Sequence, residues 1–365
     1  MMEVVSATAI LIIPWVVYGL YKWPLLRVIR KIDPIVVAYG IGFAYGTIFE
    51  PPKAVIGKSI AAIAIGLCLP LLIMTMDIRS TYRLFPKAMW TLVGFALCVV
   101  SSGILAQPFL DQTANPKAIA AMITATFVGS APNLAAVGLA LNVEETLFLQ
   151  VQSTDLVISA GFFMFLVALG IPFGLRYLPL QKSSSTSIPS YVPPPQKKTS
   201  ILLATALPIL VIAAAGLSTY LLPDSYRTLG AILTVSVLSL GLASIPVKSF
   251  IPNTTKAGEI CFWHFCAATG SQLKLDTFLE LPIQLLVFTI AVLVGALLLH
   301  LLLCRFFKID RQLFFVTAIA GIFSPVMVVP LSRRVGGETL TLIGLGVGLF
   351  GLGIGTISGL LVAYF

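Results

Sequence analysis

The sequence predicts an all-α polytopic membrane protein built from two related halves. Of the 365 residues, 58% are hydrophobic and 10% are charged, and the mean hydropathy is +1.02. A soluble domain of this length cannot bury so much apolar surface in its core. Apolar segments of membrane-spanning length recur along the whole chain. Two of these segments are interrupted by polar and helix-breaking residues at corresponding positions in the two halves.

Twelve apolar segments follow one another along the chain, and we expect a helix in each. They lie near residues 4–21, 34–50, 56–76, 89–110, 118–141, 146–173, 199–222, 228–246, 257–273, 281–304, 312–331 and 339–365. The first segment is interpreted as a membrane span and not as a cleavable signal peptide. Acidic Glu3 precedes it and basic residues follow it from Lys22 to Lys31, which is the reverse of a signal-peptide pattern.

A Ser- and Pro-rich stretch divides the chain almost in half. It contains three consecutive prolines and several basic residues, between the sixth and seventh apolar segments. This composition is typical of a solvated linker. The predicted organisation is a first transmembrane repeat over residues 1–175, a cytoplasmic linker over residues 176–198, and a second, inverted repeat over residues 199–365.

The two halves share a pattern at a fixed separation. Three residue pairs stand 193 positions apart: Thr124 with Thr317, Pro132 with Pro325, and Glu145 with Glu338. Each half therefore carries an apolar segment broken by proline, a spacer of the same length, and an acidic start to a final long span. We interpret this pattern as an internal duplication. Paired interrupted segments are the best sequence indication of the binding site of a transporter.

The distribution of basic residues distinguishes two topologies. If all twelve segments cross the membrane, the 23 Lys and Arg residues divide almost equally between its two sides. If segments 118–141 and 312–331 instead return to the side they entered from, most basic residues face the cytoplasm, as the positive-inside rule requires. The sequence therefore predicts about ten transmembrane helices plus two re-entrant or broken helical segments, with the two halves inverted. The alternative is that both interrupted segments are kinked helices that cross.

The first interrupted segment reads ATFVGSAPNLAAVG, and the second contains GIFSPVMVV. A helix broken at membrane depth leaves backbone groups unpaired, so its tip needs protein or a polar cavity beside it. The predicted helix-breaking residues are Gly129, Pro132 and Pro325. The predicted substrate-binding residues are Thr124, Ser130, Asn133, Thr317 and Ser324. The helix arm after each tip directs its positive end at this cavity, which favours an anionic group.

A carboxylate is predicted deep in the sixth segment. Asp155 follows Glu145 by ten residues, roughly 15 Å into the span, and no Lys or Arg is nearby in sequence. Such a carboxylate is protonated, binds a cation or faces water. The predicted cation-binding residues are Asp155, Asn133, Thr154, Ser153 and Gln152. Oxygen ligands with one negative charge suit Na⁺ or a transported proton better than a divalent ion. The alternative is a structural Asp that bonds to another helix.

Other classes of function are disfavoured by the sequence. No Walker motif, nucleophile elbow or HExxH motif occurs, so an enzyme is not expected. The five cysteines lack metal-type spacing, and we expect no cofactor and no metal beyond the possible Na⁺. The net charge of +9 is attributed to cytoplasmic loops, including Arg333 and Arg334, and not to nucleic-acid binding. The stretch AATGSQ, residues 267–272, is a weaker candidate for further oxygen ligands.

The stretch FVGSAPNLAAV, residues 127–137, is followed within the membrane by Thr154, Asp155 and Leu156. This pattern resembles the YjcL-like membrane proteins of bacteria and plastids, a family of unknown function. That family is more distantly similar to glutamate:sodium, 2-hydroxycarboxylate and bile-acid:sodium symporters and to cation:proton antiporters. The resemblance implies a scaffold domain and a core domain that move against each other as an elevator. The glutamate:sodium symporters have Gly-rich hairpins, unlike this chain, so the substrate stays open.

Three functions are compatible with the sequence. The leading hypothesis is an elevator-type secondary active transporter that couples Na⁺ to the uptake of a small organic anion. The second is an antiporter that exchanges protons for Na⁺ or K⁺ at Asp155. The third is a membrane scaffold that transports nothing. The expected partners are a small anion or monovalent cation, the lipid bilayer and, as an option, a second copy of the chain. The expected location is a bacterial inner membrane, with a plastid or thylakoid membrane as the alternative.

Overall fold

The computed structural model describes residues 2–22, 32–49, 53–74, 84–113, 115–181, 201–223, 227–244, 254–273, 281–323 and 325–365. These residues form helices and their connections, and no β-sheet occurs among them. The helices are α1 (Met2–Lys22), α2 (Pro34–Ile48), α3 (Ala54–Ile73), α4 (Phe85–Leu105), α5 (Pro116–Gly129), α6 (Ala131–Ala140), α7 (Glu145–Phe165), α8 (Ile171–Tyr177), α9 (Ile201–Tyr220), α10 (Arg227–Ser244), α11 (Thr255–Gln272), α13 (Ile283–Phe306), α14 (Arg311–Ile322) and α15 (Pro325–Tyr364). A 3₁₀ turn, Gln107–Leu110, follows α4, and a π-helical turn, Leu166–Gly170, joins α7 to α8.

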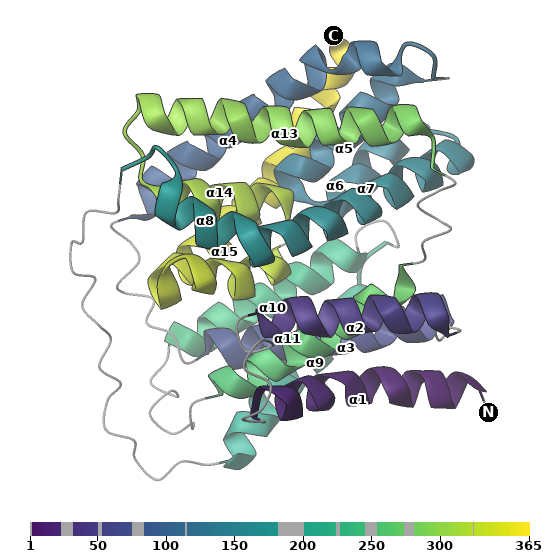
Figure 1. Ribbon diagram of the computed structural model, residues 1–365, viewed down its shortest axis with the longest axis vertical. Coiled ribbons are helices and arrows are strands. Elements are labelled where there is room, and N and C mark those ends of the chain that lie inside the picture. Colours follow the sequence, from purple (N-terminus) through teal and green to yellow (C-terminus); the bar gives the residue numbers. More distant parts are fainter. Residues whose placement is uncertain are drawn as a thin grey trace.

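The helices form two bundles, which lie one above the other in Figure 1. The bundle that we call the α11 bundle consists of α1, α2, α3, α9, α10 and α11, with α11 packed along both α2 and α3. The bundle that we call the hairpin bundle consists of α4 to α8 and α13 to α15, with α15 packed along α5 and α14. Each bundle takes helices from both halves of the chain. The boundary in space is therefore not the boundary in sequence.

Small residues bring α2 and α11 into backbone contact. A Cβ atom added to Gly42 would collide with the carbonyl oxygen of Ala267, and one added to Gly46 would collide with that of Ser271. Glycines four positions apart lie on one face of a helix. Such a face allows close approach in membranes, where lipid supplies little hydrophobic driving force for helix association. Close packing therefore holds α2 in the α11 bundle, although this helix has only 15 residues.

Six helices among the described residues are long and apolar enough to cross a membrane. They contain the segments Val55–Leu72, Phe85–Leu105, Glu145–Tyr177, Leu202–Tyr220, Ile283–Phe306 and Met327–Tyr364. Large apolar side chains on them also face outward, and Trp90 and Leu202 are 76% and 77% exposed. Outward-facing apolar surface of this kind is what lipid contact requires. The chain is therefore a polytopic membrane protein. The predicted ten spans require that some of the shorter helices also cross the membrane, and this number stays a prediction.

The first interrupted segment folds back on itself. α5 ends at Gly129 and α6 begins at Ala131, with Ser130 between them at a φ of 64°. Met122 and Gly138 lie eight residues before and after Ser130, and a Cβ atom on Gly138 would be 3.3 Å from the Met122 sulfur. In one continuous helix these two residues would be about 24 Å apart. The helices α5 and α6 are therefore the two arms of a helical hairpin.

The second interrupted segment has the same form. Gln312 Nε2, at the start of α14, donates a hydrogen bond of 3.2 Å to the carbonyl oxygen of Val335 in α15. The two segments are therefore antiparallel. The helix α15 is then broken at Gly337, where φ is 73°. Residues 325–335 are thus the returning arm of a second hairpin, and residues 338–364 are a separate long helix.

The two hairpins correspond at the separation found in the sequence. Their tips lie at Ser130 and Phe323, and the long helices that follow them begin at Glu145 and Glu338. Both pairs are 193 positions apart, the separation from which the duplication is predicted. The inverted orientation of the two halves and the depth of the tips in a bilayer stay predictions. Of the predicted linker, residues 182–198 lie outside the described residues.

Candidate functional site

A cavity of about 320 Å³ lies where the two hairpin tips meet. The first tip, the middle of α7, the second tip, and the helices α2 and α11 all contribute to its wall. The lining residues are Tyr39, Thr126, Ser130, Ala131, Pro132, Asp155, Leu156, Ser159, Ala160, Phe163, Phe265, Thr269, Ile322, Phe323 and Met327. The cavity is thus bounded by both bundles, and we call it the central cavity.

The tip of the first hairpin presents an unusual backbone to this cavity. Ser130 has a positive φ, which is uncommon for any residue with a side chain, and its N–H donates to the carbonyl oxygen of Thr126 at 2.6 Å. Its hydroxyl is buried and has no hydrogen-bond partner within the described part of the chain. Ser130, predicted as a substrate-binding residue, therefore carries a polar group that is available to a bound molecule. Pro132 lines the same wall.

Asn133 is used differently from the prediction. Its side-chain Nδ2 donates to the carbonyl oxygen of Gly129 at the end of α5, and its Oδ1 accepts from Thr356 Oγ1 at 2.7 Å. The residue is 4% exposed and is not among the residues that line the central cavity. Asn133 thus ties the first hairpin to α15, and its predicted role as a cation and substrate ligand has no support in this geometry.

Asp155, predicted as a cation ligand, lies in the wall of the central cavity. It is 8% exposed, and its Oδ1 accepts a hydrogen bond of 2.9 Å from Ser159 Oγ, one turn further along α7. None of the described lining residues is Lys, Arg or His, and Asp155 is the one carboxylate among them. A buried carboxylate with one hydroxyl donor needs further compensation from a proton, a cation or water. The wall of the central cavity therefore contains a buried carboxylate that no described lining residue neutralises.

The neighbours of Asp155 in sequence do not share its position. The Thr154 side chain is buried and donates to the carbonyl oxygen of Gln150 in its own helix at 2.8 Å. Ser153 is half-buried, and Gln152 is exposed. None of these three lines the central cavity. Successive residues of a helix point about 100° apart, and for this reason a run of polar residues cannot all face one side.

The remaining predicted substrate residues are not brought together. Thr124 is fully buried beside Gly103 of α4. Thr317 Oγ1 donates to the carbonyl oxygen of Leu313 at 2.8 Å and lies 3.1 Å from His300 Nε2. Both threonines lie inside the hairpin bundle and away from the cavity. Ser324 lies outside the described residues, as does the side chain of Pro325, the first residue of α15.

Three polar lining residues were not predicted as ligands, and a fourth was predicted only as a weaker candidate. Ser159 follows Asp155 by four positions, and this helical spacing was the available signal. Tyr39 of α2 has a buried hydroxyl without a hydrogen-bond partner within the described part of the chain. Thr269 of α11 belongs to the stretch that the sequence marked as a weaker candidate. Thr126 donates to Met122 in its own helix and carried no signal.

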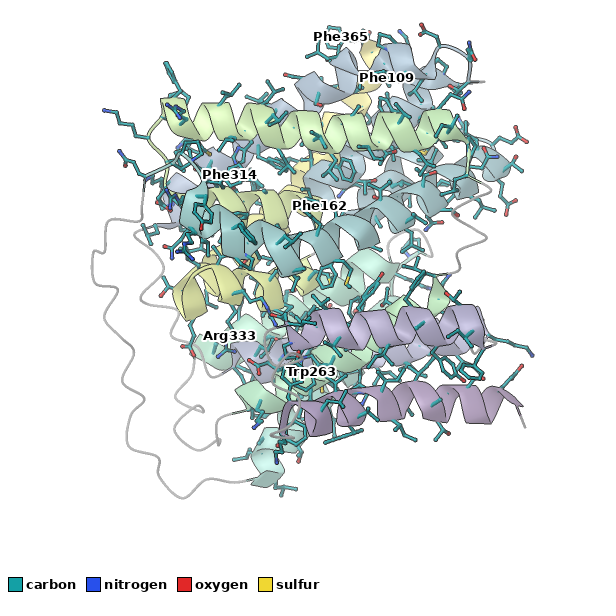
Figure 2. The ribbon with its side chains drawn as sticks, in the orientation of Figure 1. Phe109, Phe162, Trp263, Phe314, Arg333 and Phe365 are labelled. Atoms are coloured by element: carbon teal, nitrogen blue, oxygen red, sulfur yellow. The ribbon has the colours of Figure 1, made fainter. Side chains whose placement is uncertain are left out.

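A second cavity, of about 400 Å³, lies between α2, α11 and the returning arm of the second hairpin. Trp263 and Arg333, labelled in Figure 2, line it at the boundary between the two bundles. Arg334 forms a two-point ion pair with Asp33, with Nη2 2.5 Å from Oδ1 and Nε 2.7 Å from Oδ2. This pair joins the hairpin bundle to the start of α2.

Contacting aromatic rings connect the walls of the two cavities. Phe163 and Phe323 line the central cavity, and Phe262 lines the second one. The Phe163 ring lies edge to face against both, with centroid distances of 6.1 Å to Phe323 and 6.3 Å to Phe262. Phe162, labelled in Figure 2, stacks on Phe323 at 6.0 Å. The boundary between the bundles beside the central cavity is therefore apolar and well packed.

The fold and the cavity define an all-helical membrane protein in which two helical hairpins meet beside a buried carboxylate. The chain belongs to the family described as "Protein of unknown function (DUF819)", which matches residues 32–365. No curated protein and no solved structure matches the chain. The match agrees with the resemblance to a family of unknown function. The more distant similarity to symporters and antiporters stays a prediction.

Proposed function

We propose that the chain is a secondary active transporter in which a monovalent cation binds at Asp155. One observation carries the proposal. Asp155 is buried in a cavity whose wall comes from both hairpin tips and both bundles, and none of the described lining residues supplies a positive side chain to balance it. Ionisable residues inside a membrane that lack a charged partner are functional by default.

The coupling follows from the charge. An empty, ionised carboxylate opposes any movement that takes it through a low-dielectric environment, and a bound cation removes most of that cost. Since the wall of the cavity is shared by two bundles, a displacement of one bundle against the other changes which side has access to it. In this elevator-type proposal the hairpin bundle moves against the α11 bundle only when Asp155 is occupied.

Two modes of coupling are proposed from different observations. Uptake of a small organic anion together with Na⁺ is supported by the N-terminal end of α6 and by the hydroxyl of Ser130 in the cavity wall. Exchange of Na⁺ or K⁺ for protons is supported by the single acidic group among the described lining residues. A cavity of 320 Å³ counts against a non-transporting scaffold. A bacterial inner membrane, or a plastid or thylakoid membrane, is the proposed location.

The test is a thermal unfolding measurement on purified protein in equal concentrations of LiCl, NaCl and KCl. A ligand that binds only the folded state stabilises it by RT ln(1 + [L]/Kd), about 2.7 kcal/mol at a hundredfold excess over Kd. We expect the salts to differ for the parent protein and for Glu145→Gln, which removes an exposed carboxylate from the same helix. We expect no difference for Asp155→Asn. Protons compete with Na⁺ for a carboxylate, so the Na⁺ effect is expected to weaken as the pH falls.

The opposite result would contradict the proposed cation site. If the three salts act alike on the parent protein and Asp155→Asn unfolds as the parent does at every pH, Asp155 has a structural role and the proposed cation site is wrong.

A further inference from the structure

The central cavity is larger than a coupling ion requires. A water molecule occupies about 30 Å³, so a cavity of 320 Å³ corresponds to about ten waters. Most of the wall is apolar, and such a wall hydrogen-bonds few waters. A cavity with this volume and lining is typical of a site for an organic molecule, in which a few polar groups fix its orientation. A solute that fits this cavity therefore has an apolar body.

The charges around the cavity favour one sign of charge on the solute. Asp155 carries a full negative charge when ionised, and none of the described lining residues is basic. The N-terminus of α6 contributes at most about half a positive charge. A carboxylate solute would therefore lie beside Asp155 with no protein cation to hold it, whereas a positive group would be attracted directly.

Aromatic rings in the cavity wall also favour a positively charged group. Four of them line the cavity: Tyr39, Phe163, Phe265 and Phe323. They come from both bundles, and the Phe163 centroid lies 5.9 Å from that of Tyr39 and 6.1 Å from that of Phe323. The faces of aromatic rings attract ammonium groups, and rings grouped around a cavity are a known way of binding quaternary ammonium compounds.

Two hydroxyl groups complete the site. The hydroxyls of Tyr39 and Ser130 belong to side chains that are 5% exposed, and neither has a hydrogen-bond partner within the described residues. Buried polar groups without partners are rare in native structures and call for an explanation. A bound molecule that presents polar groups to these oxygens supplies that explanation.

We propose that the solute of the central cavity is a small organic cation with an apolar body, an amine or a quaternary ammonium compound, held by Asp155 and the four rings. The inference rests on the proposed function and favours its exchange mode over anion uptake, because solute and coupling ion then share one carboxylate. Two cations that compete for one carboxylate are not bound together. The solute therefore crosses in exchange for Na⁺ or protons, and not together with them.

The test uses three probes of similar shape and different charge: choline, neutral 3,3-dimethylbutan-1-ol and anionic 3,3-dimethylbutyrate. Binding is measured by thermal unfolding of the parent protein and of three variants. The variants are Asp155→Asn, Phe265→Leu, which keeps an apolar side chain and removes a ring, and Phe109→Leu as a control. Phe109 is 52% exposed, belongs to the 3₁₀ turn after α4 and does not line the cavity (Figure 2).

We expect choline to stabilise the parent protein and Phe109→Leu, with a much weaker effect of the neutral probe and none of the anion. Asp155→Asn is expected to abolish the choline effect. Phe265→Leu is expected to weaken apparent choline affinity about threefold to tenfold. Added Na⁺ is expected to raise the choline concentration required, since both ions compete for Asp155.

The outcomes separate this inference from the proposed function. If Na⁺ stabilises the protein through Asp155 but the anionic probe binds in place of choline, the proposed function stands and the inference is overturned. If choline binds equally to all variants, or if its effect adds to that of Na⁺ without competition, the inference is also overturned. If neither ions nor probes act through Asp155, both proposals fail.

Discussion

Replacement of Asn133 tests how the first hairpin is held in place. Its amide satisfies the carbonyl oxygen of Gly129 at the C-terminal end of α5 and accepts a hydrogen bond from Thr356 of α15. Asn133→Leu keeps a side chain of similar size and removes both bonds. Thr356→Val keeps the shape of its side chain and removes only the donor. The two variants therefore separate the contribution of each bond.

The expected magnitudes follow from the number of polar groups left unpaired. Thr356→Val leaves only the Asn133 Oδ1 atom without its donor, which costs about 1 kcal/mol of unfolding free energy, since single interhelical bonds in membranes average about 0.6 kcal/mol. Asn133→Leu leaves the Gly129 carbonyl and the Thr356 hydroxyl unpaired, at about 1–2 kcal/mol each. The total is about 3 kcal/mol. The double variant leaves only the Gly129 carbonyl unpaired, so its expected loss of about 1–2 kcal/mol is about 2–3 kcal/mol smaller than the sum of the two single losses.

The assay is equilibrium unfolding in mixed detergent micelles, with Thr47→Val as the control. Thr47 is exposed on α2, and its hydroxyl donates to the carbonyl oxygen of Phe43 in the same helix. If Asn133→Leu unfolds like the control and its combination with Thr356→Val is strictly additive, the amide does not anchor the hairpin. If Asn133→Leu instead keeps full stability and loses the response to Na⁺, Asn133 is the ion ligand that the sequence predicts.

Two further predictions concern contacts in and between the bundles. Gly46→Ala is expected to lower the free energy of unfolding by about 1–3 kcal/mol, because the new Cβ atom collides with the carbonyl oxygen of Ser271. Gly40→Ala, which has open space around its position, is the thermal-unfolding control and is expected to cause no loss. Arg334→Gln is expected to cost about 1 kcal/mol, since both side chains of its pair with Asp33 are about one-quarter exposed. Asp33→Asn, which can still accept the hydrogen bond from the Ile35 N–H and removes only the charge, is expected to add little to the loss from Arg334→Gln, and strictly additive losses would contradict a stabilising ion pair.

The helices could be predicted closely because composition and length determine them. Apolar segments near 34–50 and 281–304 correspond to α2 and α13, and the polar interruptions correspond to hairpin tips. The grouping into two bundles could not be predicted from the residues alone. It depends on contacts between helices far apart in sequence, such as α2 with α11, where the small residues that permit the contact leave no trace in hydropathy.

Part of the site could be predicted for a similar reason. Asp155 and Ser130 stand out because a buried carboxylate and a broken helix are costly wherever the chain folds. Asn133 is equally polar, but its amide completes the end of α5, and hydrogen bonds to local backbone cannot be distinguished from ligand binding by residue type. Tyr39 and Phe265 belong to the other bundle, so only the packing of the bundles identifies them.

Each hairpin contacts the long helix of the other half, and the two contacts differ. In α15, Cβ atoms added to Gly351, Gly355 and Gly359 would lie within 3 Å of the first hairpin, at the Val128 carbonyl oxygen, the Asn133 side chain and the Ala121 carbonyl oxygen respectively. The spacing of four positions puts all three glycines on one helix face, which admits the hairpin to backbone contact.

The positions that correspond to these glycines in the first half, 193 residues earlier, are Ile158, Phe162 and Leu166. These large side chains prevent a comparably close approach of the second hairpin, and Phe162 instead stacks on Phe323 at its tip. Space is left beside α7 as a result, and the central cavity with Asp155 lies on that side of the helix. The difference between these two corresponding helix faces therefore accounts for a cavity beside α7. Phe162→Gly, which opens that face, is expected to shrink the cavity by admitting the second tip.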